Sequence, residues 1–92
     1  MERLNEFVRV EFVEVMPENK EYGVLYISKR FNLVICLCPD GCGYEAVMPL
    51  KPKAYGWDYK EQDGKVTLSP SVANDCPNKA HFFIRDNKII WV

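Results

Sequence analysis

The sequence predicts an all-β fold, a small sandwich or partly open barrel of about eight short strands. Two observations lead to this prediction. Hydrophobic residues recur with a period of two rather than 3.6, as strands require, and proline or turn-forming pairs separate the hydrophobic runs at short intervals. The chain has 92 residues, which fits one domain spanning residues 1–92.

The N-terminal half predicts four strands. Val8, Val10 and Phe12 alternate with charged residues, which is typical of a half-buried strand over 8–13. The prolyl segment at 16–19 ends this strand because proline lacks an amide donor. Further β-branched or aromatic runs predict strands at the ranges 24–28, 33–37 and 44–48.

The C-terminal half predicts two hairpins. Segments 57–59 and 66–68 flank Asp63-Gly64, and segments 81–85 and 88–91 flank Asp86-Asn87. Both pairs contain residues that tolerate the positive φ of a two-residue turn. We expect Ser69-Pro70-Ser71 to break the strand that precedes it.

Charge and hydropathy exclude several partners. The chain carries 12 basic and 13 acidic side chains, a formal net charge of −1, which gives no general attraction to nucleic acid or an anionic membrane. No apolar run approaches the roughly 18–20 residues that span a bilayer, and charges occupy the N-terminus where a signal peptide is apolar. We therefore expect a cytoplasmic protein, where clustered cysteines more often bind metal than form structural disulfides.

Two turn-rich pairs predict a metal site. Cys38 and Cys42 have three residues between them in a turn with a proline and two glycines, and Cys76 and His81 have four residues between them, the first of which is another proline. Both spacings lie in or near the range of zinc ligand pairs. The sequence thus predicts one Zn²⁺ held by Cys38, Cys42, Cys76 and His81, a filled shell that favours a structural ion over a catalytic one.

Alternatives remain open at this site. Free cysteines also occur as small buried hydrophobes, and the clustering could be coincidence. Cys36 shares a strand face with Cys38, and we interpret it as a core residue; a substitute ligand or a Cys36–Cys38 redox pair are the other interpretations.

From Gly23 onward the chain resembles a known family. The resemblance lies in the runs Gly23-Val24-Leu25-Tyr26, Cys38-Pro39-Asp40-Gly41-Cys42-Gly43, Leu68-Ser69-Pro70-Ser71, His81-Phe82-Phe83-Ile84-Arg85 and Ile90-Trp91. Together they are similar to small bacterial proteins classed as domain of unknown function 6527. Such relatives commonly read C-P-C-G-C-G, so Asp40 stands where the middle cysteine would be and is either dispensable or an oxygen ligand. Some are encoded beside ubiquitin-like conjugation components, which implies an accessory role.

The functional prediction is a non-enzymatic, zinc-stabilised interaction module with a protein partner, in particular a component of a ubiquitin-like pathway. The alternative is a zinc-dependent hydrolase or transferase with an open metal position beside Glu45 or Asp40, and a nucleic-acid-binding zinc domain ranks below it. Ser69, Ser71, Asp75 and His81 include the residue types of a hydrolase triad. However, no G-x-S-x-G elbow is present, and His81 is assigned to the metal, so the triad is set aside.

Overall fold

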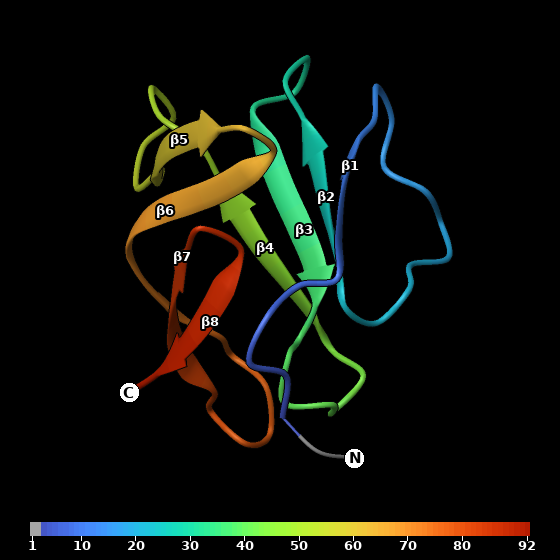
Figure 1. The fold of residues 1–92 in the computed structure, drawn as a ribbon, viewed down its shortest axis with the longest axis vertical. Coiled ribbons are helices and arrows are strands. Elements are labelled where there is room, and N and C mark those ends of the chain that lie inside the picture. The colour runs from blue at the N-terminus through green and yellow to red at the C-terminus, as the bar shows by residue number, and fades with distance from the viewer. Residues whose placement is uncertain (1–2) are drawn as a thin grey trace.

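Eight strands in two four-stranded sheets form the regular structure of residues 3–92, the part of the chain that the computed structural model describes (Figure 1). The strands are β1 Arg9–Phe12, β2 Val24–Ser28, β3 Leu33–Leu37, β4 Glu45–Pro49, β5 Asp58–Gln62, β6 Lys65–Ala73, β7 His81–Arg85 and β8 Lys88–Trp91. The predicted all-β class is confirmed. No helix in these residues is long and apolar enough to cross a membrane.

The first sheet has the order β1-β2-β3-β4. Strand β1 runs parallel to β2, whereas β2–β3 and β3–β4 are antiparallel. All five residues of β2 are buried, because this apolar run has neighbours on both edges and no side facing water. The turn that carries Cys38 and Cys42 joins β3 to β4.

The second sheet has the order β5-β6-β7-β8, and each neighbouring pair is antiparallel. The two predicted hairpins are present. Asp63 and Gly64 have φ values of 54° and 78°, and Asp86 and Asn87 have 49° and 65°. Positive φ at both central residues matches the right-handed twist of the flanking strands.

The expected break at Ser69-Pro70-Ser71 is wrong, since β6 continues through it to Ala73. The pairing is instead irregular there: the register changes between the pairs Leu68–Ile84 and Val72–Phe82. The extra β6 residues form a bulge, a place where a strand accommodates proline without losing a ladder hydrogen bond. The long strand therefore brings Ser71 beside β7.

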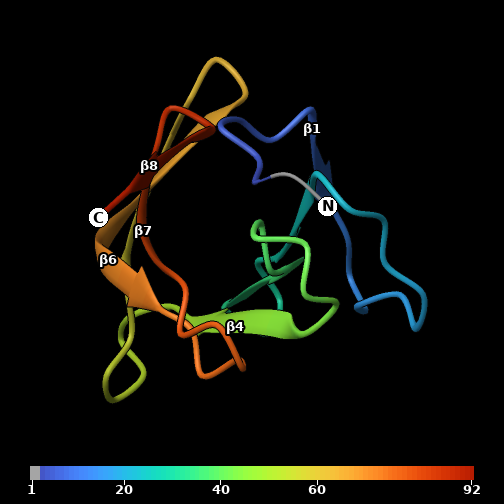
Figure 2. The ribbon, with the colours of Figure 1, turned by 90° about the horizontal axis from the view of Figure 1, so that it is seen from below.

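The core lies between the two sheets, which curve around it (Figure 2). Its largest fully buried side chains include Phe82, Leu25, Ile27, Met48, Leu68 and Ile84. Two isolated bridges connect the sheets at their margins, a parallel one between Leu50 and Trp57 and an antiparallel one between Glu6 and Lys88. The architecture is thus a sandwich partly closed towards a barrel.

Candidate functional site

Three thiols and one carboxylate converge at one end of the molecule. The sulfur atoms of Cys38, Cys42 and Cys76 and a carboxylate oxygen of Asp40 all lie within 4.8 Å of one another. Three of these residues come from the β3–β4 turn, and Cys76 comes from the connection between β6 and β7. The cluster therefore joins the two sheets through their loops.

Backbone geometry explains how the turn gathers its ligands. Gly41 and Gly43 have φ values of 82° and 87°, a region that glycine adopts without steric cost. The Gly41 amide donates to the Cys38 carbonyl at 3.0 Å, and the Cys38 amide donates to the Tyr44 carbonyl at 2.7 Å. This closed turn points both cysteines to the same side.

Asp40 is held in place as an anion. Its Oδ1 accepts from the Cys42 amide at 2.9 Å, and its Oδ2 accepts from Asn78 Nδ2 at 3.1 Å and faces the Cys76 sulfur at 3.7 Å. Burial acts to raise the pKa of Asp40, but hydrogen bonds from Cys42, Cys38 and Asn78 outweigh it and hold this pKa below its usual range. A fixed carboxylate beside three thiols is a suitable oxygen ligand for a cation.

The surroundings of Cys38 and Cys76 shift the pKa values of their thiols in opposite directions. Burial raises the pKa of Cys38 to about 12, although the Asn74 side chain acts to lower it. Backbone hydrogen bonding near Ala80 lowers the pKa of Cys76. Asn74 Nδ2 is otherwise buried without a partner, and a thiolate at Cys38 would give it an acceptor. The site thus fits a cation that converts its thiols to thiolates, and thiolate-rich sets suit Zn²⁺.

The predicted ligands are only partly brought together. Cys38, Cys42 and Cys76 converge as expected, and Asp40 joins them, whereas His81 is not a member of this group. His81 as fourth ligand stays a prediction, and the geometry favours Asp40 in that position. Cys36 is fully buried in the core, as interpreted from the sequence, and burial raises the pKa of its thiol above the ordinary range.

His81 instead contacts a serine. Its Nε2 lies 2.8 Å from Ser71 Oγ. His81 pairs with Ala73 across β6 and β7, so Ser71, two residues earlier, is its diagonal neighbour on the same face. Val72 between them is buried, which turns Ser71 outward. A serine oxygen within hydrogen-bond distance of an imidazole is the arrangement that activates a nucleophile.

The remaining members of the triad set aside above lie elsewhere. Asp75 pairs with Lys79 at 2.7 Å, and Ser69 lies two residues before Ser71 on the strand. In residues 3–92 no carboxylate forms an ion pair with His81. The described geometry is therefore a serine–histidine pair rather than a triad. Sequence reasoning named both residues but set them aside, because no G-x-S-x-G elbow is present and His81 was assigned to the metal. Their contact depends on the β6–β7 register, which is irregular before Val72.

A polar cavity of about 340 Å³ lies between the cluster and the pair. It is lined by Arg3, Asp40, Asn78, Lys79, Ala80, His81 and Val92. Asp40 of the cysteine cluster and His81 of the pair thus both line this cavity. Glu45, the general base considered for a zinc enzyme, is instead paired with Lys20 at 2.8 Å.

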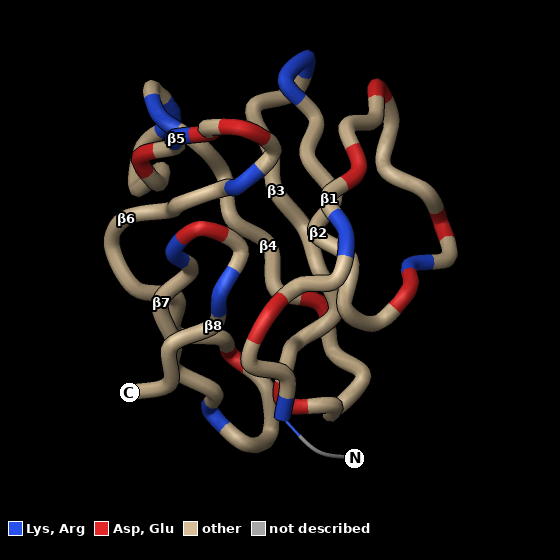
Figure 3. The backbone as a smooth tube through the Cα atoms, viewed as in Figure 1, with Lys and Arg blue, Asp and Glu red and all other residues tan. Residues whose placement is uncertain are grey.

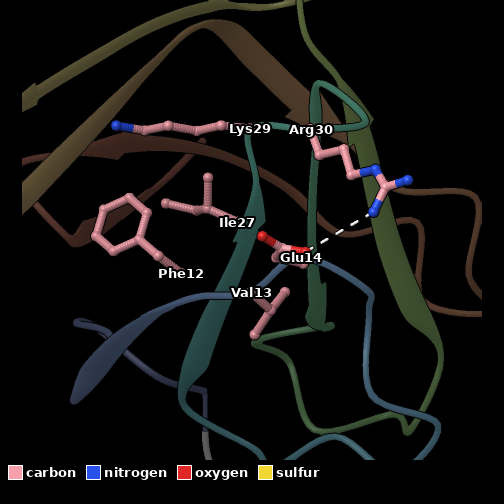
Figure 4. Close-up of a pocket in the computed structure, with 6 residues that line it drawn as sticks. All are labelled: Phe12, Val13, Glu14, Ile27, Lys29 and Arg30. Atoms are coloured by element: carbon pink, nitrogen blue, oxygen red, sulfur yellow. Dashed lines mark ion pairs between the residues drawn. The ribbon is translucent and has the colours of Figure 1, made fainter.

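A second cavity, of about 300 Å³, lies at the opposite end of the molecule (Figure 4). Phe12, Val13 and Ile27 give it an apolar part, and Lys29 and Arg30 belong to the basic β2–β3 turn (Figure 3). Arg30 pairs with Glu14 at 3.7 Å, and Lys29 lies 5.2 Å above the Phe12 ring. These cations already have partners within the chain.

Two further basic residues, Lys51 and Lys53, also have partners within the chain. Lys51 pairs with Asp58 at 3.1 Å, and Lys53 donates to the Phe31 carbonyl. These contacts are those of an ordinary charged surface loop.

Comparison with known proteins places the chain in a family. A family model described as bacterial ubiquitination-like system serine protease, BubE, matches residues 12–92, and the chain belongs to this family. The match supports the link to ubiquitin-like systems that the sequence resemblance implied, although the family carries a different description. No curated protein and no solved structure matches the chain.

Proposed function

We propose that this protein is a serine hydrolase of a bacterial ubiquitination-like system, with Ser71 as nucleophile and His81 as general base. The observation that carries the proposal is the 2.8 Å contact between Ser71 Oγ and His81 Nε2 on the outer face of the second sheet. The family description, which names a serine protease, supports it. Because that description names an enzyme, the prediction of a non-enzymatic interaction module stays unconfirmed.

The pair can perform acyl transfer in two half-reactions. Ser71 Oγ attacks the carbonyl carbon of an ester or amide while His81 Nε2 takes the hydroxyl proton. The bond to the leaving oxygen or nitrogen then breaks, and His81 returns the proton to that atom. Water next attacks the acyl-serine ester, loses its proton to His81 and releases a carboxylic acid, and the proton returns to Ser71.

We further propose that Zn²⁺ binds Cys38, Asp40, Cys42 and Cys76 and has a structural role. Four protein ligands fill a tetrahedral shell, so the ion leaves no position for a catalytic water. The role follows from chain connectivity: Cys76 lies in the connection whose two ends carry Ser71 and His81. Fixing Cys76 to the β3–β4 turn holds β6 and β7 in the register that the pair requires.

The partner proposed for this hydrolase is a protein of the same system, such as a ubiquitin-like modifier joined to a target through its carboxyl end. The family description supports a protein substrate, since it names a protease of a ubiquitination-like pathway. A cytoplasmic location, where such conjugates form, stays part of the proposal.

A fluorophosphonate probe tests the nucleophile directly, because it reacts with activated serines independently of substrate identity. We expect stoichiometric labelling of the wild-type protein at Ser71, identified by peptide mass analysis. Ser71→Ala should abolish labelling and lower ester hydrolysis by at least about a thousandfold. Ser69→Ala, which removes a neighbouring exposed serine, is the matched control and should label normally. Labelling that is absent from the wild-type protein, or that persists in Ser71→Ala, would contradict the assignment.

A further inference from the structure

The second half of β6 has a partner on only one side. Strand β5 pairs with β6 from Gln62–Lys65 up to Asp58–Ser69 and no further. Strand β7 pairs with β6 at Val72 and Ala73. Beyond Ser69, therefore, β6 has an edge with no strand beside it in residues 3–92. This edge begins at Pro70, three residues before Ala73, and includes the proposed nucleophile Ser71.

Hydrogen-bond alternation shows which residues face that edge. The Asn74 amide donates to the Ala80 carbonyl at 2.8 Å, so this pair belongs to the hydrogen-bonded set of the antiparallel ladder. In such a ladder, hydrogen-bonded and non-hydrogen-bonded pairs alternate along the strand. Val72 therefore directs its N–H and C=O towards β7, whereas Ala73 directs both groups towards the open edge. The Ser71 C=O shares a peptide unit with the Val72 N–H and points the opposite way, so it also faces the edge.

The other side of β7 gives a consistent result. The Val92 amide donates to the His81 carbonyl at 3.1 Å, so the main chain of His81 is turned towards β8 rather than β6. This agrees with Ala73–His81 being a non-hydrogen-bonded pair of the β6–β7 ladder. Ala73 is also exposed, and among the described residues no turn or loop backbone hydrogen bond involves Ser71 or Ala73.

We propose that the substrate binds as an extended strand along this edge, hydrogen-bonded to the main chain of Ser71 and Ala73. This inference rests on the proposed function and names the form in which the substrate enters: an unfolded peptide segment rather than a folded surface. The base lies on the β7 side of Ser71, and the added strand lies on the other side. Ser71 Oγ then lies between the His81 imidazole, which takes its proton, and the substrate carbonyl that it attacks.

Strand addition also supplies specificity and charge stabilisation. Main-chain hydrogen bonds bind a peptide irrespective of its side chains, at the normal strand spacing of about 4.8 Å. Where the peptide unit that joins Pro70 to Ser71 turns its N–H to this edge, the Ser71 N–H can donate to the carbonyl oxygen under attack, a role that the nucleophile's own amide plays in oxyanion holes. Under this proposal, a folded domain that offers no free strand at its cleavage site is not a direct substrate.

Proline at position 73 tests the proposal. Ala73→Pro removes the edge-facing N–H without removing a ladder donor, because edge positions accommodate proline, and Ala73→Val is the control that keeps the N–H. The probes are p-nitrophenyl acetate, which has no peptide backbone to pair, and the p-nitrophenyl ester of an acetylated tetrapeptide. Relative to Ala73→Val, we expect Ala73→Pro to lower kcat/KM for the tetrapeptide ester by roughly three- to tenfold more than it lowers kcat/KM for the acetate. Equal kcat/KM values of the two variants for the tetrapeptide ester would overturn strand addition.

Two further measurements use the wild-type protein. N-methylation of successive amides in the tetrapeptide ester should lower kcat/KM at alternate positions only, since alternate residues of a strand face the same neighbour; uniform sensitivity contradicts the proposal. In the free protein, the Ala73 amide should exchange with deuterium much faster than the Val72 amide. A protected Ala73 amide means that the edge is occupied and overturns strand addition even if no ester is hydrolysed. Failure of fluorophosphonate labelling, by contrast, counts against the nucleophile and not against the edge.

Discussion

The cysteine cluster and the serine–histidine pair differ in how the chain builds them. The cluster joins residues 36 positions apart, Asp40 and Cys76, in loops of different sheets, and two of its thiols are buried. The pair joins Ser71 and His81 across neighbouring strands of one sheet, on an exposed face. The first arrangement holds loops together, and the second leaves reactive atoms open to solvent. The connection between β6 and β7 contains Cys76 of the cluster and joins the two strands that carry Ser71 and His81. A change in this short segment should therefore affect both the stability of the domain and the proposed reaction.

The largest effect should come from Cys76→Ser, which separates the loops. Binding energies of structural Zn²⁺ are on the order of 10–16 kcal/mol, comparable to or above the whole stability of a small domain. We expect this variant to lose zinc and to unfold near room temperature. Elemental analysis and circular dichroism measure the two effects. A folded, zinc-loaded Cys76→Ser protein would show that the connection is not tied by metal.

His81→Gln sharpens the comparison because His81 was predicted as a ligand but lies against Ser71. If the imidazole is the base, hydrolysis and fluorophosphonate labelling should fall by about 10²–10⁴-fold, the usual contribution of a general base. Zinc content and thermal stability should remain at wild-type values. Loss of zinc in this variant would restore the Cys38, Cys42, Cys76 and His81 set.

Asp40→Asn makes the reciprocal test on the cluster. The amide keeps the shape of the side chain and loses its charge, so zinc affinity should fall by at least about tenfold. Competition with a chromophoric chelator measures this change. Labelling of Ser71 in zinc-saturated protein should be retained, because Asp40 takes no part in the proposed proton transfers. An unchanged zinc affinity would exclude Asp40 as a ligand.

The smallest effect is expected from Cys36→Ser. The thiol lies in the core, outside the cluster, and burying a hydroxyl there without a partner costs roughly 1–3 kcal/mol. Chemical denaturation should show this loss with zinc stoichiometry unchanged. Zinc loss on this substitution would mean that Cys36 exchanges with a ligand.

Much of the fold was accessible from sequence because its signals are local. The hairpin turns at Asp63-Gly64 and Asp86-Asn87 need positive φ, and Asp, Asn and Gly are the residue types that favour it in two-residue turns. The Cys38–Cys42 turn is local in the same sense. Cys76 was predicted from its spacing to His81, which resembles that of a zinc ligand pair.

The Ser71–His81 contact and the ligand role favoured for Asp40 had no comparable signal. Ser69-Pro70 reads as a strand break, whereas the structure carries the strand through a bulge and so sets which β6 residue faces His81. Such a register is decided by how Val72 and Phe82 pack in the core, which the spacing of polar residues does not encode. Asp40 was recognised as an unusual residue in the turn, but only the approach of Cys76 and Asn78 places it among the thiols.

The N-terminal segment ends up beside the last hairpin. Asn87 and Asn5 carbonyls accept from the Phe7 and Ile89 amides at 2.8 Å, and Trp91 Nε1 donates to the Leu4 carbonyl at 2.9 Å. On the ribosome these early residues emerge long before β8 exists. Their hydrogen bonds to the last hairpin cannot form until nearly the whole chain has been synthesised. Pairing at such sequence separation is slow, so this closure should be a late event in folding, and β8 keeps a bare edge until it happens.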